Sequence, residues 1–136
     1  MTVDALELRL LAACAVVRES GQIARDFFIR REQLEIEHKG AQDLVSIADR
    51  QVEEVIRSHL AAAFPDDGII GEEGETIEPP SGAGSWVIDP IDGTANFLRG
   101  MPYWSVALAY VRDGATEIGV TYDPVHDELF AAGRGR

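Results

Sequence analysis

Hydrophobic residues recur at helical spacing in the first part of the chain, and the pattern becomes strand-like after Pro65. A first set of apolar or small residues predicts one long helix from Asp4 to Arg31. Its members are Leu6, Leu10, Cys14, Val17, Ala24 and Phe28. Gly21 is a weak point of this helix, because glycine disfavours the helical backbone. The alternating segment 34–39 that follows predicts a short strand.

A second helix is predicted before Pro65, which ends it because proline cannot continue a helix. Residues 43–49 form an apolar, strand-like run that leads into this helix. The turn residues 66–68 then reverse the chain. The face of the helix that we expect to pack into the core comprises Val52, Ile56, Leu60 and Ala63.

Short apolar segments between turn residues predict that the rest of the chain forms strands. Asp113-Gly114 is a strong hairpin signal. Segment 74–85 is rich in Gly, Pro, Ser and Glu and predicts an exposed loop. The expected strands are 69–70, 86–89, 105–112, 117–122 and 128–132. The pattern therefore predicts an α+β fold, with an N-terminal helix pair packed on an antiparallel β-sheet meander.

The composition indicates a single globular domain over residues 1–136, with 46% hydrophobic residues. The net charge of -12 repels nucleic acid phosphates and anionic lipids, so we expect neither nucleic acid nor a membrane as a partner. Cys14 is the single cysteine, which excludes an intramolecular disulfide and suits a reducing, cytoplasmic location. The last predicted strand would leave an open sheet edge, so we expect a C-terminally truncated domain.

The segment Trp86–Asn96 carries the strongest chemical signal. An apolar run ends in Asp89, and a turn stiffened by Pro90 leads to Asp92. Such a turn can direct both carboxylates, and the carbonyl of Ile91, into one small volume. Glu72 follows another short apolar run and supplies a third carboxylate if the two strands are neighbours. A donor set made only of oxygen atoms favours Mg²⁺, Mn²⁺ or Ca²⁺ over zinc.

Gly93 and Thr94 suit the binding of an anion beside these carboxylates. Gly93 permits a positive φ or close approach by a ligand. If a helical turn begins near Thr94, its free N–H groups point at an anion. The Thr94 hydroxyl can relay a proton from an activated water. Asp49 is a possible partner for this hydroxyl, because we expect it to begin a helix.

Each of these features, taken alone, has a simpler structural interpretation. Pro-x-Asp-Gly is a common turn, Glu72-Glu73 suits a solvated loop, and Asp49 or Thr94 suits a helix cap. The histidines lack metal-ligand spacing, and we expect His38, His59 and His126 to lie on the surface. We expect the aromatic residues Trp86, Phe97, Tyr103 and Trp104 to pack the core.

In its ordered set of motifs the chain resembles the inositol monophosphatase family. The resemblance covers nearly the whole chain, and the Asp-Pro-Ile-Asp-Gly-Thr block after Gly-Glu-Glu is highly specific. It implies that the chain is the N-terminal half of a layered αβαβα sugar-phosphatase fold. The matching positions are Lys39, 43–49, 64–65, 70–73, 86–97, 100–102, 119–124 and 128–130.

The resemblance also implies a role for each site residue. Glu72, Asp89 and the Ile91 carbonyl would bind a first Mg²⁺, and Asp89 with Asp92 a second, in a complete site of two or three ions. Thr94 and Asp49 would orient and deprotonate the attacking water. Gly93, Thr94 and Glu72 would hold the phosphate or substrate. Family members are commonly homodimers, which implies a homodimer here.

The sequence departs from the family in lacking the second half. That half carries a Trp-Asp-x-Ala-Ala-Gly-like motif whose aspartate completes the second metal site. The leading hypothesis is Mg²⁺-dependent hydrolysis of a phosphate monoester of a small sugar or polyol, such as myo-inositol monophosphate. Alternatives are a phosphatase for histidinol phosphate, a nucleotide 3′-phosphate or fructose bisphosphate, a non-catalytic metal-binding or dimerisation fragment, or an inert truncated product.

Overall fold

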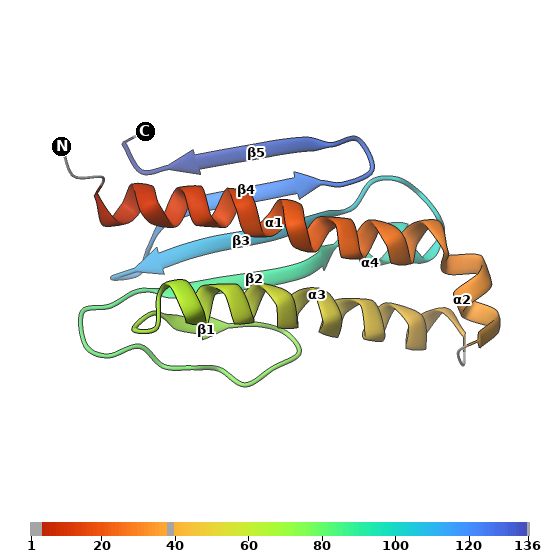
Figure 1. The fold of residues 1–136 in the computed structure, drawn as a ribbon, viewed down its shortest axis with the longest axis horizontal. Coiled ribbons are helices and arrows are strands. Elements are labelled where there is room, and N and C mark those ends of the chain that lie inside the picture. The colour runs from red at the N-terminus through yellow and green to blue at the C-terminus, as the bar shows by residue number, and fades with distance from the viewer. Residues whose placement is uncertain (1–3, 38–39, 136) are drawn as a thin grey trace.

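The computed structural model describes residues 4–37 and 40–135 and confirms the α+β class. Two long helices lie side by side across one face of a five-stranded sheet (Figure 1). In chain order the elements are α1 (Ala5–Ile29), α2 (Arg31–Glu37), α3 (Ala41–Ala63), β1 (Gly68–Ile70), β2 (Ser85–Asp92), α4 (Thr94–Leu98), β3 (Ser105–Arg112), β4 (Ala115–Asp123) and β5 (Glu128–Gly133).

The sheet is mixed, with the strands in the order β1-β2-β3-β4-β5. Strands β2 to β5 form the predicted antiparallel meander, but β1 pairs with β2 in parallel, with Ile69 opposite Trp86 and Ile70 opposite Val87. The purely antiparallel prediction was therefore wrong for β1, because segment 71–84 carries the chain back before β2 begins. The carboxyl ends of β1 and β2 consequently lie at the same edge of the sheet.

The core lies between the helices and the sheet. Phe28, Phe97 and Trp104 contact one another there with ring centroids 5.0–5.5 Å apart. Helix α1 continues unbroken through Gly21, where an added Cβ would lie 2.6 Å from the Tyr122 ring. The predicted weak point is thus a place of close approach between α1 and β4. Tyr103 was wrongly assigned to the core, since it is 65% exposed.

Helix α3 begins at Ala41, earlier than predicted. Leu44, Val45 and Ala48 are buried, so the apolar face of the helix extends through the segment that the sequence suggested was strand-like. Their spacing of three and four residues continues that of the later core residues. Asp49 therefore lies inside the helix and is not its N-cap. Ala63, predicted to face the core, is exposed.

The strand predicted over 34–39 is wrong within the described residues, because 31–37 form α2. The Leu34 N–H donates to the Arg30 carbonyl at 2.9 Å, and the Leu34 side chain is buried. A short alternation does not distinguish a strand from a helix with one buried side chain per turn. Residues 38 and 39, which include His38 and the motif residue Lys39, lie outside the described residues.

The hairpin turn predicted at Asp113-Gly114 is confirmed. Asp113 and Gly114 have φ values of 54° and 73°, as a tight hairpin between β3 and β4 requires. Segment 74–84 is mostly exposed, although Ile77 forms a β-bridge with Ile69. Among the described residues, no helix combines the length and the apolar character that crossing a lipid bilayer demands.

Candidate metal and phosphate site

A β-bulge in β2 brings Asp89 and Asp92 to the same side of the sheet. Asp89 pairs with Ala107 and Asp92 with Ser105, so β2 takes one more residue than β3 between these pairs. The predicted proline turn was wrong, since the strand continues through Pro90 and Ile91. Both of these residues are buried, whereas Asp92 is exposed and Asp89 partly exposed. In a regular strand residues i and i+3 point to opposite faces, and the extra residue cancels that reversal.

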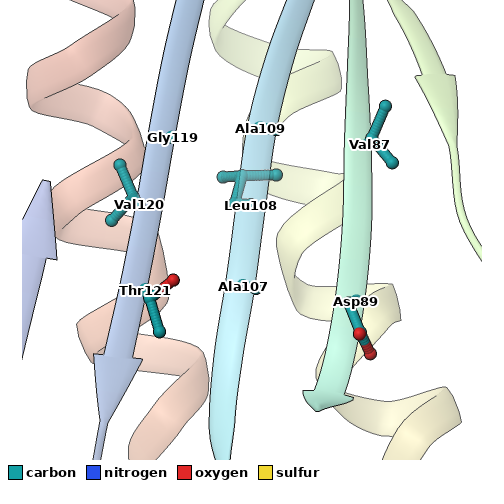
Figure 2. A pocket seen from close by; sticks show the side chains of 8 residues that line it. All are labelled: Val87, Asp89, Ala107, Leu108, Ala109, Gly119, Val120 and Thr121. Atoms are coloured by element: carbon teal, nitrogen blue, oxygen red, sulfur yellow. The ribbon is translucent and has the colours of Figure 1, made fainter. Parts of the chain in front are cut away.

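The two aspartates line hollows on the sheet face that α1 and α3 leave uncovered. Asp89 lies beside Ala107 and Thr121 at a shallow hollow of about 250 Å³ (Figure 2). Asp92 lies with Gly93 at a second hollow of about 330 Å³, which Thr121 also lines. A ligand therefore has access to both carboxylates from solvent.

Glu72 reaches the same edge of the sheet through the parallel pairing of β1 and β2. It follows Ile70 by two residues, and Asp89 follows Val87 by two, while Ile70 and Val87 are paired in register. Burial is the largest cause that raises the pKa of Asp89 to about 6, and the charges of Glu72 and Asp92 add to it. The sequence-based expectation that the two strands are neighbours is therefore confirmed.

Asp49 faces this group from helix α3. It is 8% exposed, and its Oδ1 atom is buried without a hydrogen-bond partner among the described residues. Its pKa is raised to about 7, mainly by burial and then by the charges of Glu73, Glu72, Asp89 and Glu53, in that order. The acidic side chains of α3, of the loop after β1 and of β2 thus share one electrostatic neighbourhood.

These carboxylates do not form a ready coordination shell. Within the described part of the chain, no three His, Cys, Asp or Glu side chains are gathered closely enough to hold a metal ion. The charges of Glu72 and Asp92 each act on Asp89 and raise its pKa. Their convergence on a single ion, and the metal roles of Glu72, Asp89, Ile91 and Asp92, stay predictions.

Gly93 and Thr94 lie where β2 passes into the short helix α4. Gly93 is its N-cap with φ of 95°, and an added Cβ would lie 3.0 Å from the Tyr103 carbonyl oxygen. The predicted positive φ is confirmed. The Thr94 hydroxyl donates to the Ile91 carbonyl at 3.2 Å. The structure thus pairs this hydroxyl with Ile91, where the sequence had suggested Asp49.

Glu53 is the residue of this region that the sequence reasoning missed. It is 2% exposed and accepts hydrogen bonds from the loop after β1 and from Arg57 Nε at 2.9 Å. Burial favours a higher pKa, but hydrogen bonds from the Glu73 N–H and from Arg57 outweigh it and lower the pKa of Glu53. A carboxylate on the apolar face of α3, four residues after Asp49 and four before Arg57, was a signal that could have identified it.

Known proteins resemble this chain in sequence. The model of the inositol monophosphatase family matches residues 6–136. The inositol-1-monophosphatase of Rhizobium meliloti (strain 1021) is 43% identical over 121 residues, which are 89% of this chain and 45% of the relative. The histidinol-phosphatase of Chlorobaculum parvum is 42% identical over 127 residues, 93% of this chain and 48% of the relative.

Solved structures resemble this fold closely. The inositol monophosphatase from Anabaena superposes with a TM-score of 0.81 at 27% identity, over 97% of this chain and 46% of that one. The extragenic suppressor protein suhB from Bartonella henselae gives 0.79 at 32% identity, over 94% of this chain and 49% of that one. The chain spans about half the length of the curated relatives it matches. By the match of the family model over nearly all its residues, the chain belongs to the inositol monophosphatase family.

Proposed function

We propose that the chain supplies the metal- and phosphate-binding part of a Mg²⁺-dependent phosphatase that hydrolyses a phosphate monoester, such as myo-inositol monophosphate. The observation that carries this proposal is that carboxylates from α3, from the loop after β1 and from β2 lie close enough for their charges to raise carboxylate pKa values. Two of them, Asp49 and Asp89, have pKa values raised to about 7 and about 6. Structural ion pairs lower carboxylate pKa values, whereas carboxylates that repel one another favour a cation.

The residues fit Mg²⁺ on chemical grounds. The donors are carboxylates and one carbonyl, which are the ligands that hard cations prefer. The buried Oδ1 of Asp49 lacks a partner among the described residues, so a further polar group can join it. Glu72, Asp89 and the Ile91 carbonyl would hold a first ion, and Asp89 with Asp92 a second. When bound, Mg²⁺ would supply positive charge that stabilises phosphoryl oxygens and makes water more acidic.

Asp49 and Thr94 are the residues that we expect to orient and deprotonate the attacking water. The Thr94 hydroxyl donates to Ile91, so its oxygen is free to accept a hydrogen bond from a water molecule. A pKa near 7 suits Asp49 Oδ1 as a proton acceptor at neutral pH. The backbone at Gly93 and Thr94, together with Glu72, would orient the phosphate and the substrate.

We propose a small phosphorylated sugar or polyol as the substrate. Histidinol phosphate is a second candidate, because the histidinol-phosphatase relative is 42% identical and the inositol-1-monophosphatase relative 43%. Nucleotide 3′-phosphates and fructose bisphosphate complete the group to be tested. A homodimer in the cytoplasm, without nucleic acid or membrane partners, belongs to the same proposal.

The test is phosphate release from this panel of substrates, with Mg²⁺ and with the metal removed by a chelator. We expect release that needs Mg²⁺ and falls at least about 100-fold in Asp92→Asn, because the variant loses charge at the metals. Asp113→Asn, in an exposed hairpin, is the matched control. Equal activity in Asp92→Asn would exclude the proposed role. Metal binding without phosphate release would favour the non-catalytic metal-binding module.

A further inference from the structure

The loop that carries Glu72 is anchored to helix α3 by a buried carboxylate. Glu53 Oε1 accepts from the N–H groups of Glu72 at 2.8 Å and Glu73 at 3.1 Å, and Oε2 accepts from that of Gly74 at 2.8 Å. Successive backbone N–H groups that turn toward one anion form a small concave nest. Here the chain fills the nest with its own side chain.

Arg57 holds Glu53 in place and completes the anchor. Its Nε donates to Glu53 Oε2 at 2.9 Å, and its Nη1 donates to the Glu75 carbonyl at 2.7 Å. The guanidinium therefore binds both the anchoring carboxylate and the next part of the loop. Charge-assisted bonds of this kind are stronger than neutral ones and fix geometry more firmly.

Two glycines allow the loop to approach this pair. A Cβ added at Gly71 would lie 2.5 Å from the Glu53 carboxylate, and one at Gly74 would lie 2.9 Å from the Arg57 guanidinium. Real Cβ atoms essentially never come this close to another heavy atom without a shift of the neighbour. The residues on either side of Glu72–Glu73 are thus packed directly against α3.

The anchor connects the loop to the rest of the site through one helix. Glu53 follows Asp49 by four residues, so the two side chains leave α3 on the same face one turn apart. Glu72 and Asp89 are both close enough to Asp49 to interact with its charge. Without an attachment, mutual repulsion would drive the exposed Glu72 loop away from the other carboxylates.

We propose that Glu53 is a positioning residue that fixes Glu72 relative to Asp49 and Asp89, with Arg57 holding Glu53. This inference rests on the proposed metal site, to which Glu53 itself contributes no ligand. Its carboxylate is already occupied by loop amides and by Arg57. Its effect on the metal is therefore transmitted through the position of Glu72.

The experiment compares four variants of the 136-residue chain by two measurements. Hydrogen exchange reports on the amides of residues 72–74, and electron paramagnetic resonance reports the affinity for Mn²⁺ alone. The variants are Glu53→Gln, Glu53→Asp, Gly71→Ala and the control Glu54→Gln, whose side chain is exposed on the same helix. Urea unfolding of each variant ensures that only folded protein is compared.

We expect Glu53→Gln to lower amide protection at residues 72–74 and Mn²⁺ affinity by about tenfold each, because a charged acceptor is lost. Glu53→Asp keeps the charge, but its side chain is too short to reach the loop. It should therefore lower amide protection and Mn²⁺ affinity as Glu53→Gln does. Gly71→Ala should lower both while every carboxylate is retained. Glu54→Gln should leave both unchanged.

The outcomes separate the positioning role from the metal site. If the wild type binds Mn²⁺ and Glu53→Gln binds it equally well, the positioning role is overturned alone. Full recovery of affinity in Glu53→Asp would also overturn it, because the charge alone would then suffice. If the wild-type chain binds no Mn²⁺, the proposed metal site fails, and the positioning role fails with it.

Discussion

A buried aspartate from another part of the chain lies near each end of β2: Asp67, just before β1, and Asp49, in α3. The two aspartates differ in their partners. Near the start of the strand, Asp67 is 6% exposed and accepts two hydrogen bonds from Arg9, at 2.7 and 2.8 Å, and one from Trp86 Nε1 at 3.0 Å. Near the other end, Asp49 is 8% exposed and its Oδ1 has no partner among the described residues. Similar burial thus occurs in two opposite electrostatic environments.

We infer from this difference that the Asp67 end serves stability, and the difference supports the proposed binding role of the Asp49 end. Asp67 meets its counter-charge within the chain, and Arg9 in turn packs over the Phe64 and Tyr110 rings at 4.6 and 5.1 Å. Asp49 instead faces other carboxylates, which raise its pKa beyond the effect of burial. A buried carboxylate without a counter-charge opposes folding, which makes Asp49 a candidate for a function that needs the charge.

The largest expected change in stability comes from removing the ion pair between Arg9 and Asp67. Asp67→Asn removes the buried charge that faces Arg9 and should destabilise the chain by about 3 kcal/mol, because the partly buried Arg9 guanidinium is left without its partner. Urea unfolding at neutral pH measures the loss. Asp66→Asn, at the exposed neighbouring position, is the control and should change stability by less than about 0.5 kcal/mol. A loss below about 1 kcal/mol in Asp67→Asn would remove the contrast between the two ends.

Removing the charge of Asp49, whose Oδ1 has no hydrogen-bond partner in the described part of the chain, is expected to stabilise the protein rather than destabilise it. The pKa of Asp49 is about 7 in the folded chain and near the ordinary 3.8 when unfolded, so the folded state binds the proton more tightly. Stability from this group is present below pH 3.8 and is lost as the pH rises through 7. Asp49→Asn should therefore be the more stable protein at pH 8 without metal, by about 2 kcal/mol.

Unfolding curves of wild type and Asp49→Asn between pH 4 and pH 8 measure this difference. The difference in the free energy of unfolding between the two proteins should be near zero at pH 4. It should increase with pH and reach a plateau above pH 7. Asp89 remains in both proteins, so most of its own contribution cancels. A variant that is less stable than the wild type at pH 8 would show that Asp49 is stabilised by a partner and would contradict the comparison.

The two buried tryptophans offer a finer test. Trp86 Nε1 donates to Asp67, whereas Trp104 Nε1 is buried without a partner among the described residues. Both side chains are at most 3% exposed, so replacement by phenylalanine removes similar packing. Trp86→Phe should cost about 1.5 kcal/mol more than Trp104→Phe, the value of a hydrogen bond to a charged acceptor. Thermal unfolding compares them, and equal costs would count against the pairing at Asp67.

The sequence predicted most of the fold because local signals were strong. Helical spacing identified α1, and Asp113-Gly114 identified the turn between β3 and β4. It misplaced the beginning of α3 and the element at residues 34–37, since short apolar or alternating runs suit both strand and helix. The parallel pairing of β1 could not be predicted, because pairing partners depend on contacts far apart in sequence.

The candidate site was predictable in its residue types and only partly in its geometry. The positive φ of Gly93 follows from the absence of a side chain and is confirmed. The bulge at Pro90–Ile91 depends on the register of β3, which the motif itself does not contain. Glu53 escaped notice because an acidic residue on a helix is usually solvated, and only the folded loop reveals its partners.

The smallest expected effect is the gain in stability when Mg²⁺ binds near Glu72, Asp89 and Asp92. At pH 8, free Mg²⁺ at roughly five times its dissociation constant should stabilise the wild-type chain by about 1 kcal/mol. At pH 5 the gain should shrink, because Asp49 and Asp89, with pKa values of about 7 and about 6, are then mostly protonated and protons compete with the cation. Thermal unfolding at both pH values, with Asp92→Asn as the control, measures the effect. Equal stabilisation at pH 5, or in Asp92→Asn, would mean that Mg²⁺ acts elsewhere on this acidic chain.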